Sequence, residues 1–179
     1  MKQKFIMSLI FTSLAIFCNA QKLEVFTTTL ELNASGKSAY ISISLKKTIE
    51  EQDAVNNKTA LDIVLIRTIN DKIKTLEWYT MNSKDNRISN ELSGNNTLIN
   101  AISFDREQFD KCITNQDLSR MTGYLSKNSF SHFASITDNL AKGIIYPCFI
   151  IEQEDGKRAL LWIEMTDETH FKVTVKKQV

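Results

Sequence analysis

The first part of the chain after residue 20 alternates apolar with polar residues. Within residues 39–45, apolar residues occupy every second position, at Ala39, Ile41, Ile43 and Leu45. A period of two is typical of a strand with one face in the core. Residues 23–32 are rich in Thr, Val and Phe, and the Asn-Ala-Ser-Gly stretch at 33–36 favours a turn. These segments therefore predict a hairpin, which the polar residues 47–59 follow as an exposed loop with at most a short helical turn.

The middle of the chain predicts a strand that is covered on both sides. Residues 61–69 (LDIVLIRTI) are apolar on both faces except for Asp62 and Arg67. Such a run is typical of a central strand. Residues 73–81 predict another strand because they are rich in apolar and aromatic residues. The Asn- and Ser-rich residues 82–96 are interpreted as a surface loop.

Residues 105–142 change to a helical period. Apolar residues recur three or four positions apart in three groups: Phe109, Cys112 and Ile113; Leu118, Met121, Tyr124 and Leu125; Phe130, Phe133, Ile136 and Leu140. This spacing predicts three short helices. Ser129 is the expected N-cap of the third helix, and Lys142 with Gly143 is its expected end.

The last third predicts a three-stranded meander over residues 144–153, 157–165 and 170–177. Asp155-Gly156 between the first two segments is the strongest short-range hairpin signal, with positive φ expected at both residues. Pro147 lacks a backbone donor, so its strand is expected at a sheet edge or bulged. The elements together predict one α+β domain over residues 21–179, an antiparallel β-sandwich-like assembly with a short helical insertion at 105–142.

The first twenty residues have the features of a secretory signal peptide. Lys2 and Lys4 precede an uncharged apolar run, and small residues precede Gln21. We therefore expect cleavage after Ala20 and an exported protein, periplasmic or secreted. Cys18 also suggests a bacterial lipoprotein, but the bulky Phe17 before it argues against a lipid anchor.

Charge and hydropathy narrow the classes of partner. Removing the leader with its two lysines changes the formal net charge from +1 to about −1. This balance gives no electrostatic reason to expect nucleic acid or an anionic membrane surface. After Ala20 no apolar run approaches the roughly 20 residues of a membrane span. A small ligand or a protein partner is therefore expected.

Two cysteines remain after the leader, Cys112 and Cys148. In an oxidising compartment they are candidates for one disulfide, which would stabilise the fold by about 4 kcal/mol on the chain-entropy model. Two separate buried thiols are nearly as good an interpretation, because spacing says nothing about proximity.

The chain contains few residues that could carry out catalysis. No zinc-protease, thioredoxin-like, α/β-hydrolase or phosphate-loop motif occurs in the chain. Cys112 with His132 is a conceivable thiolate and base, but the apolar spacing around Cys112 favours packing. Asp62 is a carboxylate in an apolar strand; Arg67 is its nearest basic residue but points to the opposite face, so a structural role is favoured for Asp62. No catalytic residue or metal site is assigned, although an enzyme of an unrecognised type stays open.

Histidine and methionine are the only soft-ligand side chains with a cofactor interpretation. In addition, residues 144–165 (IIYPCFIIEQEDGKRALLWIEM), followed by HFKVTV, and ALDIVLIRT at 60–68 resemble the closing meander and one strand of HmuY-like haem-binding proteins. Leu61 stands where that family often has Trp, and the family's lipid-bearing cysteine is missing. The resemblance implies a β-rich fold with a haem or ligand face, and no ligand residue can be carried over from the family. The haem-ligand candidates among the residues are His132, Met121, Met81 and His170.

These observations predict an exported non-catalytic binding protein. The alternatives are a haem-binding protein of HmuY-like type and a periplasmic immunity or inhibitor protein directed against a secreted toxin or enzyme.

Overall fold

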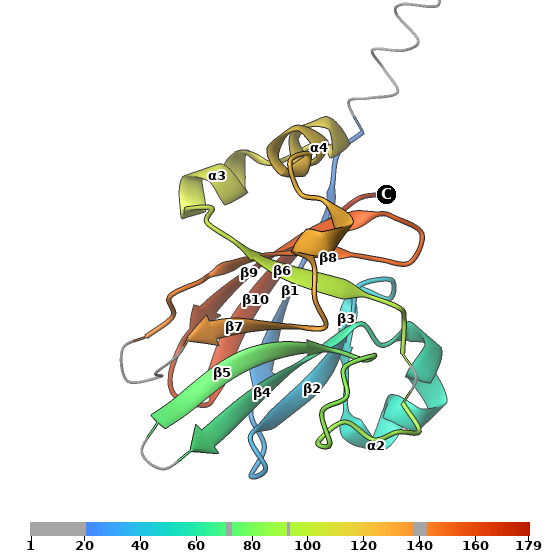
Figure 1. The fold of residues 1–179 in the computed structure, drawn as a ribbon, viewed down its shortest axis with the longest axis vertical. Helices are drawn as coiled ribbons and strands as arrows, with labels where there is room; N and C mark the ends of the chain where they lie inside the picture. Colours follow the sequence, from blue (N-terminus) through green and yellow to red (C-terminus); the bar gives the residue numbers. More distant parts are fainter. Residues whose placement is uncertain (1–20, 71–72, 93, 138–142) are drawn as a thin grey trace, which may run out of the picture.

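The computed structural model describes residues 21–70, 73–92, 94–137 and 143–179. The expected signal peptide lies outside the described residues. Two five-stranded antiparallel sheets pack face to face (Figure 1). The first has the order β1 (Glu24–Glu31), β10 (His170–Lys177), β9 (Arg158–Met165), β8 (Cys148–Glu152), β6 (Leu98–Ile102). The second has the order β3 (Lys47–Ile49), β2 (Lys37–Ser42), β4 (Ile63–Asn70), β5 (Ile73–Thr80), β7 (Phe133–Thr137).

The C-terminal meander is confirmed. Strands β8, β9 and β10 are consecutive neighbours in the first sheet. The turn between β8 and β9 differs from the expected form, because Gly156 has φ of 80° while Asp155 has negative φ. The Gly156 N–H donates to the Gln153 carbonyl at 2.9 Å, so the hairpin closes through a longer loop with a single left-handed glycine. Pro147 lies just before β8, which is an interior strand, so the expectation of an edge or bulge was wrong.

The central strand is also confirmed. β4 lies between β2 and β5, and its residues 63–66 are buried, as are the two residues before it. β5 follows β4 as the expected neighbouring strand. The loop at 82–96 lies over the outer face of this sheet, where Ile88 and Leu92 are buried. The segment at 47–59, expected as a loop, contains β3, helix α2 (Glu51–Ala54) and most of a 3-10 turn (Val55–Ala60).

The predicted N-terminal hairpin was wrong. β1 pairs with β10 and β2 pairs with β3 and β4, so the two strands belong to different sheets. The turn at 33–36 exists, but it carries the chain from one layer to the other. Local pattern cannot distinguish these outcomes, because a hairpin and a crossing between sheets need the same alternation and the same turn residues.

The third predicted helix was also wrong. Helices α3 (Arg106–Lys111) and α4 (Asn115–Thr122) form, each with a capping box. After a 3-10 turn (Lys127–Ser129) the chain becomes strand β7, in which Ala134 and Ile136 face the core. A short apolar run fits either the helical or the strand period, and this one forms a strand because it pairs with β5. The expected end of the helix, including Leu140 and Lys142, lies outside the described residues.

Three apolar clusters organise the molecule in layers. The largest lies between the sheets and contains Trp78 and Phe149, whose ring centroids are 6.4 Å apart in an edge-to-face arrangement. A second lies between the first sheet and helices α3 and α4, where Phe109 packs on Trp162. A third lies on the outer face of the second sheet beneath α2 and the loop at 82–96. Both sheets are therefore covered on the outside over part of their area.

The two sheets are joined along one side. Ile99 of β6 and Ser131, just before β7, exchange two backbone hydrogen bonds of 2.9 Å. Asp62 makes a second connection, because its carboxylate accepts from the Ile43 N–H at 2.7 Å and from the Thr97 hydroxyl at 3.0 Å. Ile43 follows β2 and Thr97 precedes β6, so this buried carboxylate connects segments next to both sheets.

Candidate functional site

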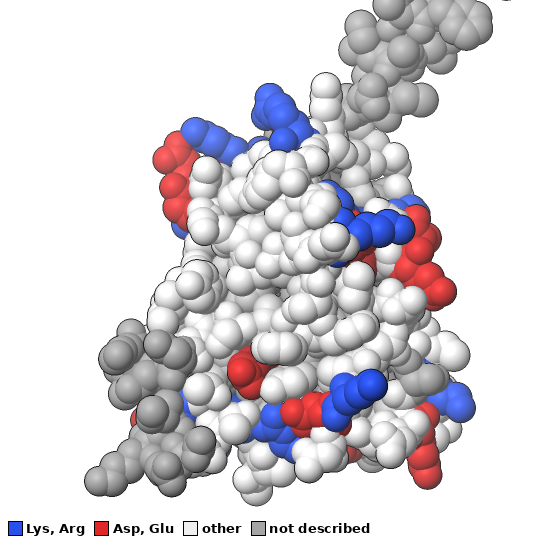
Figure 2. Space-filling view, in the orientation of Figure 1, with Lys and Arg blue, Asp and Glu red and all other residues white. Residues whose placement is uncertain are grey.

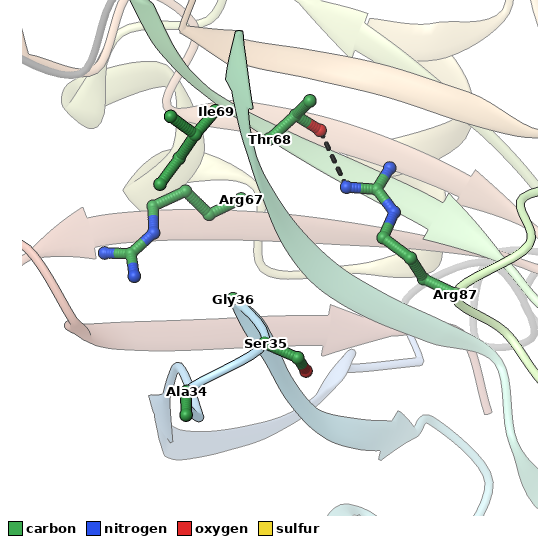
Figure 3. A pocket seen from close by; sticks show the side chains of 7 residues that line it. All are labelled: Ala34, Ser35, Gly36, Arg67, Thr68, Ile69 and Arg87. Atoms are coloured by element: carbon green, nitrogen blue, oxygen red, sulfur yellow. Dashed lines mark hydrogen bonds between the residues drawn. The ribbon is translucent and has the colours of Figure 1, made fainter. Parts of the chain in front are cut away.

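The candidate site is a notch beside the end of β4. The pairing of β2 with β4 runs from Ile63 to Ile66, whereas β4 continues to Asn70. The last residues of β4 therefore extend beyond β2, and the turn at 33–36 lies next to them. A cavity of about 270 Å³ occupies this place (Figure 3), lined by Ala34, Ser35, Gly36, Arg67, Thr68, Ile69 and Arg87.

The floor of the notch is a tight turn stabilised by Asn33. The Asn33 side-chain oxygen accepts from the backbone N–H groups of Ser35 and Lys37, each at 3.0 Å. Gly36 has φ of 79°, and its carbonyl accepts from the Arg67 N–H at 2.7 Å. A Cβ at this position would lie 2.9 Å from the Arg67 carbonyl oxygen, so glycine is needed both for its conformation and for the close approach.

Arg67 lies at one side of the notch, on the inward face of β4. Its Nη1 donates to the Glu168 carbonyl at 3.4 Å, and its Nε is buried without a hydrogen-bond partner. No carboxylate forms an ion pair with Arg67 in the part of the chain that the structure describes. This guanidinium therefore keeps its positive charge and part of its donor capacity for another group.

Arg87 lies on the other side of β4, as Figure 3 shows, and each of its three guanidinium nitrogens donates to a hydrogen-bond partner. It donates to the Thr68 hydroxyl at 2.8 Å and to both carboxylate oxygens of Asp85, at 2.7 and 2.6 Å. It also contacts the Tyr79 hydroxyl at 3.3 Å. The hydrogen bond from Arg87 lowers the pKa of Asp85, so this pair stays ionised and the charge of Arg87 is neutralised.

The neighbouring charges are also paired. The Lys37 ammonium is bound to the Glu51 carboxylate and donates to the Arg87 carbonyl at 3.3 Å. Lys74 pairs with Glu168 at 3.0 Å. On the face shown in Figure 2, basic and acidic side chains lie beside one another and much of the surface is uncharged. Unlike Lys37, Lys74 and Arg87, Arg67 has no carboxylate partner among the described residues.

The notch therefore provides a guanidinium, hydroxyl groups and strand-edge backbone. A guanidinium binds carboxylates and phosphates through two parallel N–H donors. Sequence reasoning noted Arg67 only as a neighbour of Asp62 and did not consider Arg87. The available signal was an arginine in an otherwise apolar strand, but its surroundings come from the turn at 33–36 and the loop at 82–96.

The four haem-ligand candidates lie in separate environments. Met81 is buried in the cluster beneath α2, and Met121 packs against the cluster beneath α3 and α4. His132 is exposed and its Nδ1 lies 3.1 Å from the Thr80 hydroxyl. His170 lies at the turn between β9 and β10, with its Nδ1 2.9 Å from Asp167. The structure therefore does not place these side chains around one cavity.

Cys112 and Cys148 are both free and buried, in the cluster beneath α3 and α4. Burial raises the pKa of Cys112 to about 11 and that of Cys148 to about 12. Such thiols are protonated near neutral pH and poor nucleophiles. The pairing of Cys112 with His132 is not formed, since the His132 ring lies beside Thr80.

Asp62 has the structural role that its position suggested. Besides Ile43 and Thr97, its carboxylate accepts from the Asn95 amide at 3.1 Å. Burial raises its pKa, and these hydrogen bonds oppose the shift. Arg67 makes no contact with it, as expected for residues on opposite faces.

No protein-family model matches the chain, and a search of curated proteins finds no match. No helix in the described ranges has the length and apolar content needed to cross a bilayer. Over the same residues, no group of three or more His, Cys, Asp or Glu side chains is arranged to hold a metal ion.

Proposed function

We propose that this chain is an exported, non-catalytic binding protein whose ligand carries an oxyanion group held by Arg67 in the notch beside β4. The observation that supports this most is the state of Arg67. Its guanidinium lines a cavity of about 270 Å³ and has no carboxylate partner within the described residues. Binding an oxyanion there would satisfy both the charge and the free donors.

The surroundings of Arg67 favour binding over catalysis. The notch supplies a guanidinium, two hydroxyls and backbone groups, and the nearby carboxylate of Asp85 is neutralised by Arg87. The hydroxyl of Ser35 donates to Asn33 at 2.7 Å, and that of Thr68 accepts from Arg87. Neither hydroxyl lies against a base that would activate it as a nucleophile.

Isothermal titration with acetate, succinate, sulfate and phosphate tests the proposal. We expect at least one anion to bind, and Arg67→Gln to weaken it by about 10- to 100-fold, the worth of a charged hydrogen bond. Arg120→Gln is the matched control, because Arg120 is an exposed arginine on α4, remote in sequence from the notch. No binding by any anion, or equal binding by the Arg67 variant, would contradict the proposal.

A further inference from the structure

The end of β4 offers a pairing position that no strand of the described chain occupies. In an antiparallel pair, successive residues direct their backbone groups alternately to one neighbour and to the other. On the β2 side, the Leu65 N–H donates to the Ser38 hydroxyl and the Arg67 N–H donates to the Gly36 carbonyl. The next residue with this orientation is Ile69, which lines the notch.

The pairing of β4 with β5, on its opposite side, leads to the same orientation for the Ile69 backbone groups. Asn70 pairs with Ile73 of β5 across a two-residue connection. The residues that close such a hairpin exchange hydrogen bonds with each other. Asn70 and Thr68 therefore direct their backbone groups towards β5, and Ile69 directs its N–H and C=O away from it, into the notch.

From these two observations we infer that the notch receives an extended peptide segment, which pairs with the Ile69 backbone and places a carboxylate on Arg67. This inference rests on the proposed function and identifies its ligand class. It combines β-strand addition at a free edge with recognition of an acidic group by arginine.

Strand geometry allows one peptide residue to pair with the Ile69 backbone and to place its carboxylate on Arg67. A residue that pairs directly opposite Ile69 carries its side chain on the same face of the sheet as Ile69 and Arg67. Diagonal neighbours across a pair lie about 7–8 Å apart, within reach of a long side chain, so a glutamate opposite Ile69 reaches the Arg67 guanidinium. The Ile69 side chain is 61% exposed and provides an apolar contact for the same segment.

A guanidinium lies at each face of β4, that of Arg67 on the inward face and that of Arg87, from the loop at 82–96, on the outer face (Figure 3). Side chains of an added strand alternate between the Arg67 face and the Arg87 face. The Arg87 charge is balanced by Asp85, so only Arg67 would favour an acidic side chain in the added strand.

The test uses the purified full chain and the synthetic peptide acetyl-Thr-Val-Glu-Val-Thr-amide. Three matched probes accompany it: the same peptide with Gln in place of Glu, the same peptide N-methylated at the Glu nitrogen, and acetyl-Thr-Val-Thr with a free C-terminal carboxylate. We expect the Glu peptide to bind at least tenfold more tightly than acetate, and the Gln and N-methyl peptides to bind at least tenfold more weakly than the Glu peptide. The Arg67→Gln variant should lose the difference between Glu and Gln, and Arg120→Gln should keep it.

The outcomes separate this inference from the proposed function. Tighter binding of the free-acid peptide than of the Glu peptide supports the inference and identifies a chain terminus as the source of the carboxylate. Equal affinity for acetate and the peptides, or no effect of N-methylation, overturns the inference. If sulfate or phosphate still binds through Arg67 in that case, the proposed function stands. If nothing binds through Arg67, both are wrong.

Discussion

Replacement of Asp62 by alanine should be among the most damaging substitutions of a polar residue in this protein. The carboxylate is fully buried and accepts hydrogen bonds from the Ile43 N–H, the Asn95 amide and the Thr97 hydroxyl. Alanine removes the acceptor and leaves three donors facing a void.

The magnitude follows from the donors. A buried donor without a partner costs about 1–3 kcal/mol, and three such donors would cost about 3–6 kcal/mol once partial access of water to the half-buried Asn95 is allowed for. Domains of this size are stable by about 5–15 kcal/mol, so Asp62→Ala should remove a large part of the free energy of unfolding. Asp62→Asn should cost less. It keeps one acceptor oxygen and removes the burial of a charge, which is what raises the pKa of Asp62.

Urea unfolding followed by tryptophan fluorescence measures these changes, because Trp78 and Trp162 are both buried. Glu91→Ala is the control, since Glu91 is an exposed carboxylate in the loop that leads to Asn95. The expected order of loss is Asp62→Ala, then Asp62→Asn, then Glu91→Ala with almost none. A loss below about 1 kcal/mol for Asp62→Ala, with an unchanged denaturant slope, would refute the assignment of Asp62 as the buried connection between the sheets.

Four further outcomes are expected. Gly36→Ala should lower the free energy of unfolding by about 1–3 kcal/mol, because the new Cβ strains the backbone and meets the Arg67 carbonyl of β4. Gly156→Ala should cost less, since Gly156 shares the positive φ but has no atom within 4 Å of the position that a Cβ would take. Equal losses would contradict the contact between Gly36 and β4. Both cysteine thiols should be unreactive to Ellman's reagent in the native protein and reactive after unfolding; an absence of free thiol in urea without reductant would show a disulfide instead. Hydrogen bonding to the Asp167 carboxylate raises the pKa of His170, so its stabilising effect should be present below the ordinary histidine pKa of about 6.5 and lost as pH rises through the raised pKa. The melting temperatures of wild type and His170→Gln should therefore converge as pH rises, and a difference that grows with pH would contradict this. Titration with haemin tests the haem prediction. Because His132 and His170 occupy separate environments, any Soret band should be lost in at most one of the variants His132→Ala and His170→Ala. Loss of the band in both single variants would contradict that separation.

Much of the fold could be predicted where the pattern is local and long. In the meander β8–β9–β10, the first two strands are continuous apolar runs and β10 has an apolar period of two. Gly156 marks the turn between β8 and β9. The central position of β4 follows from its apolar character on both faces. Helices α3 and α4 were predicted from their period, and each begins at a capping box.

The errors share one physical cause. Residues 133–137 fit a helix or a strand, and residues 24–42 fit a hairpin or a crossing between sheets. In each case the choice depends on which distant strand offers a partner: β5 for β7, and β10 for β1. Local free-energy differences between such alternatives are small, so long-range pairing decides them.

The amino-acid sequence by itself determined the class of fold, the buried central strand and the closing meander, because these depend on side-chain period and turn chemistry within short segments. Only the tertiary structure decided which strands share a sheet and that the end of β4 extends beyond β2. It also placed Arg67 beside a strand edge that no described strand covers. That site is made by segments near residues 35, 68 and 87, and their proximity is a property of packing that no local pattern encodes.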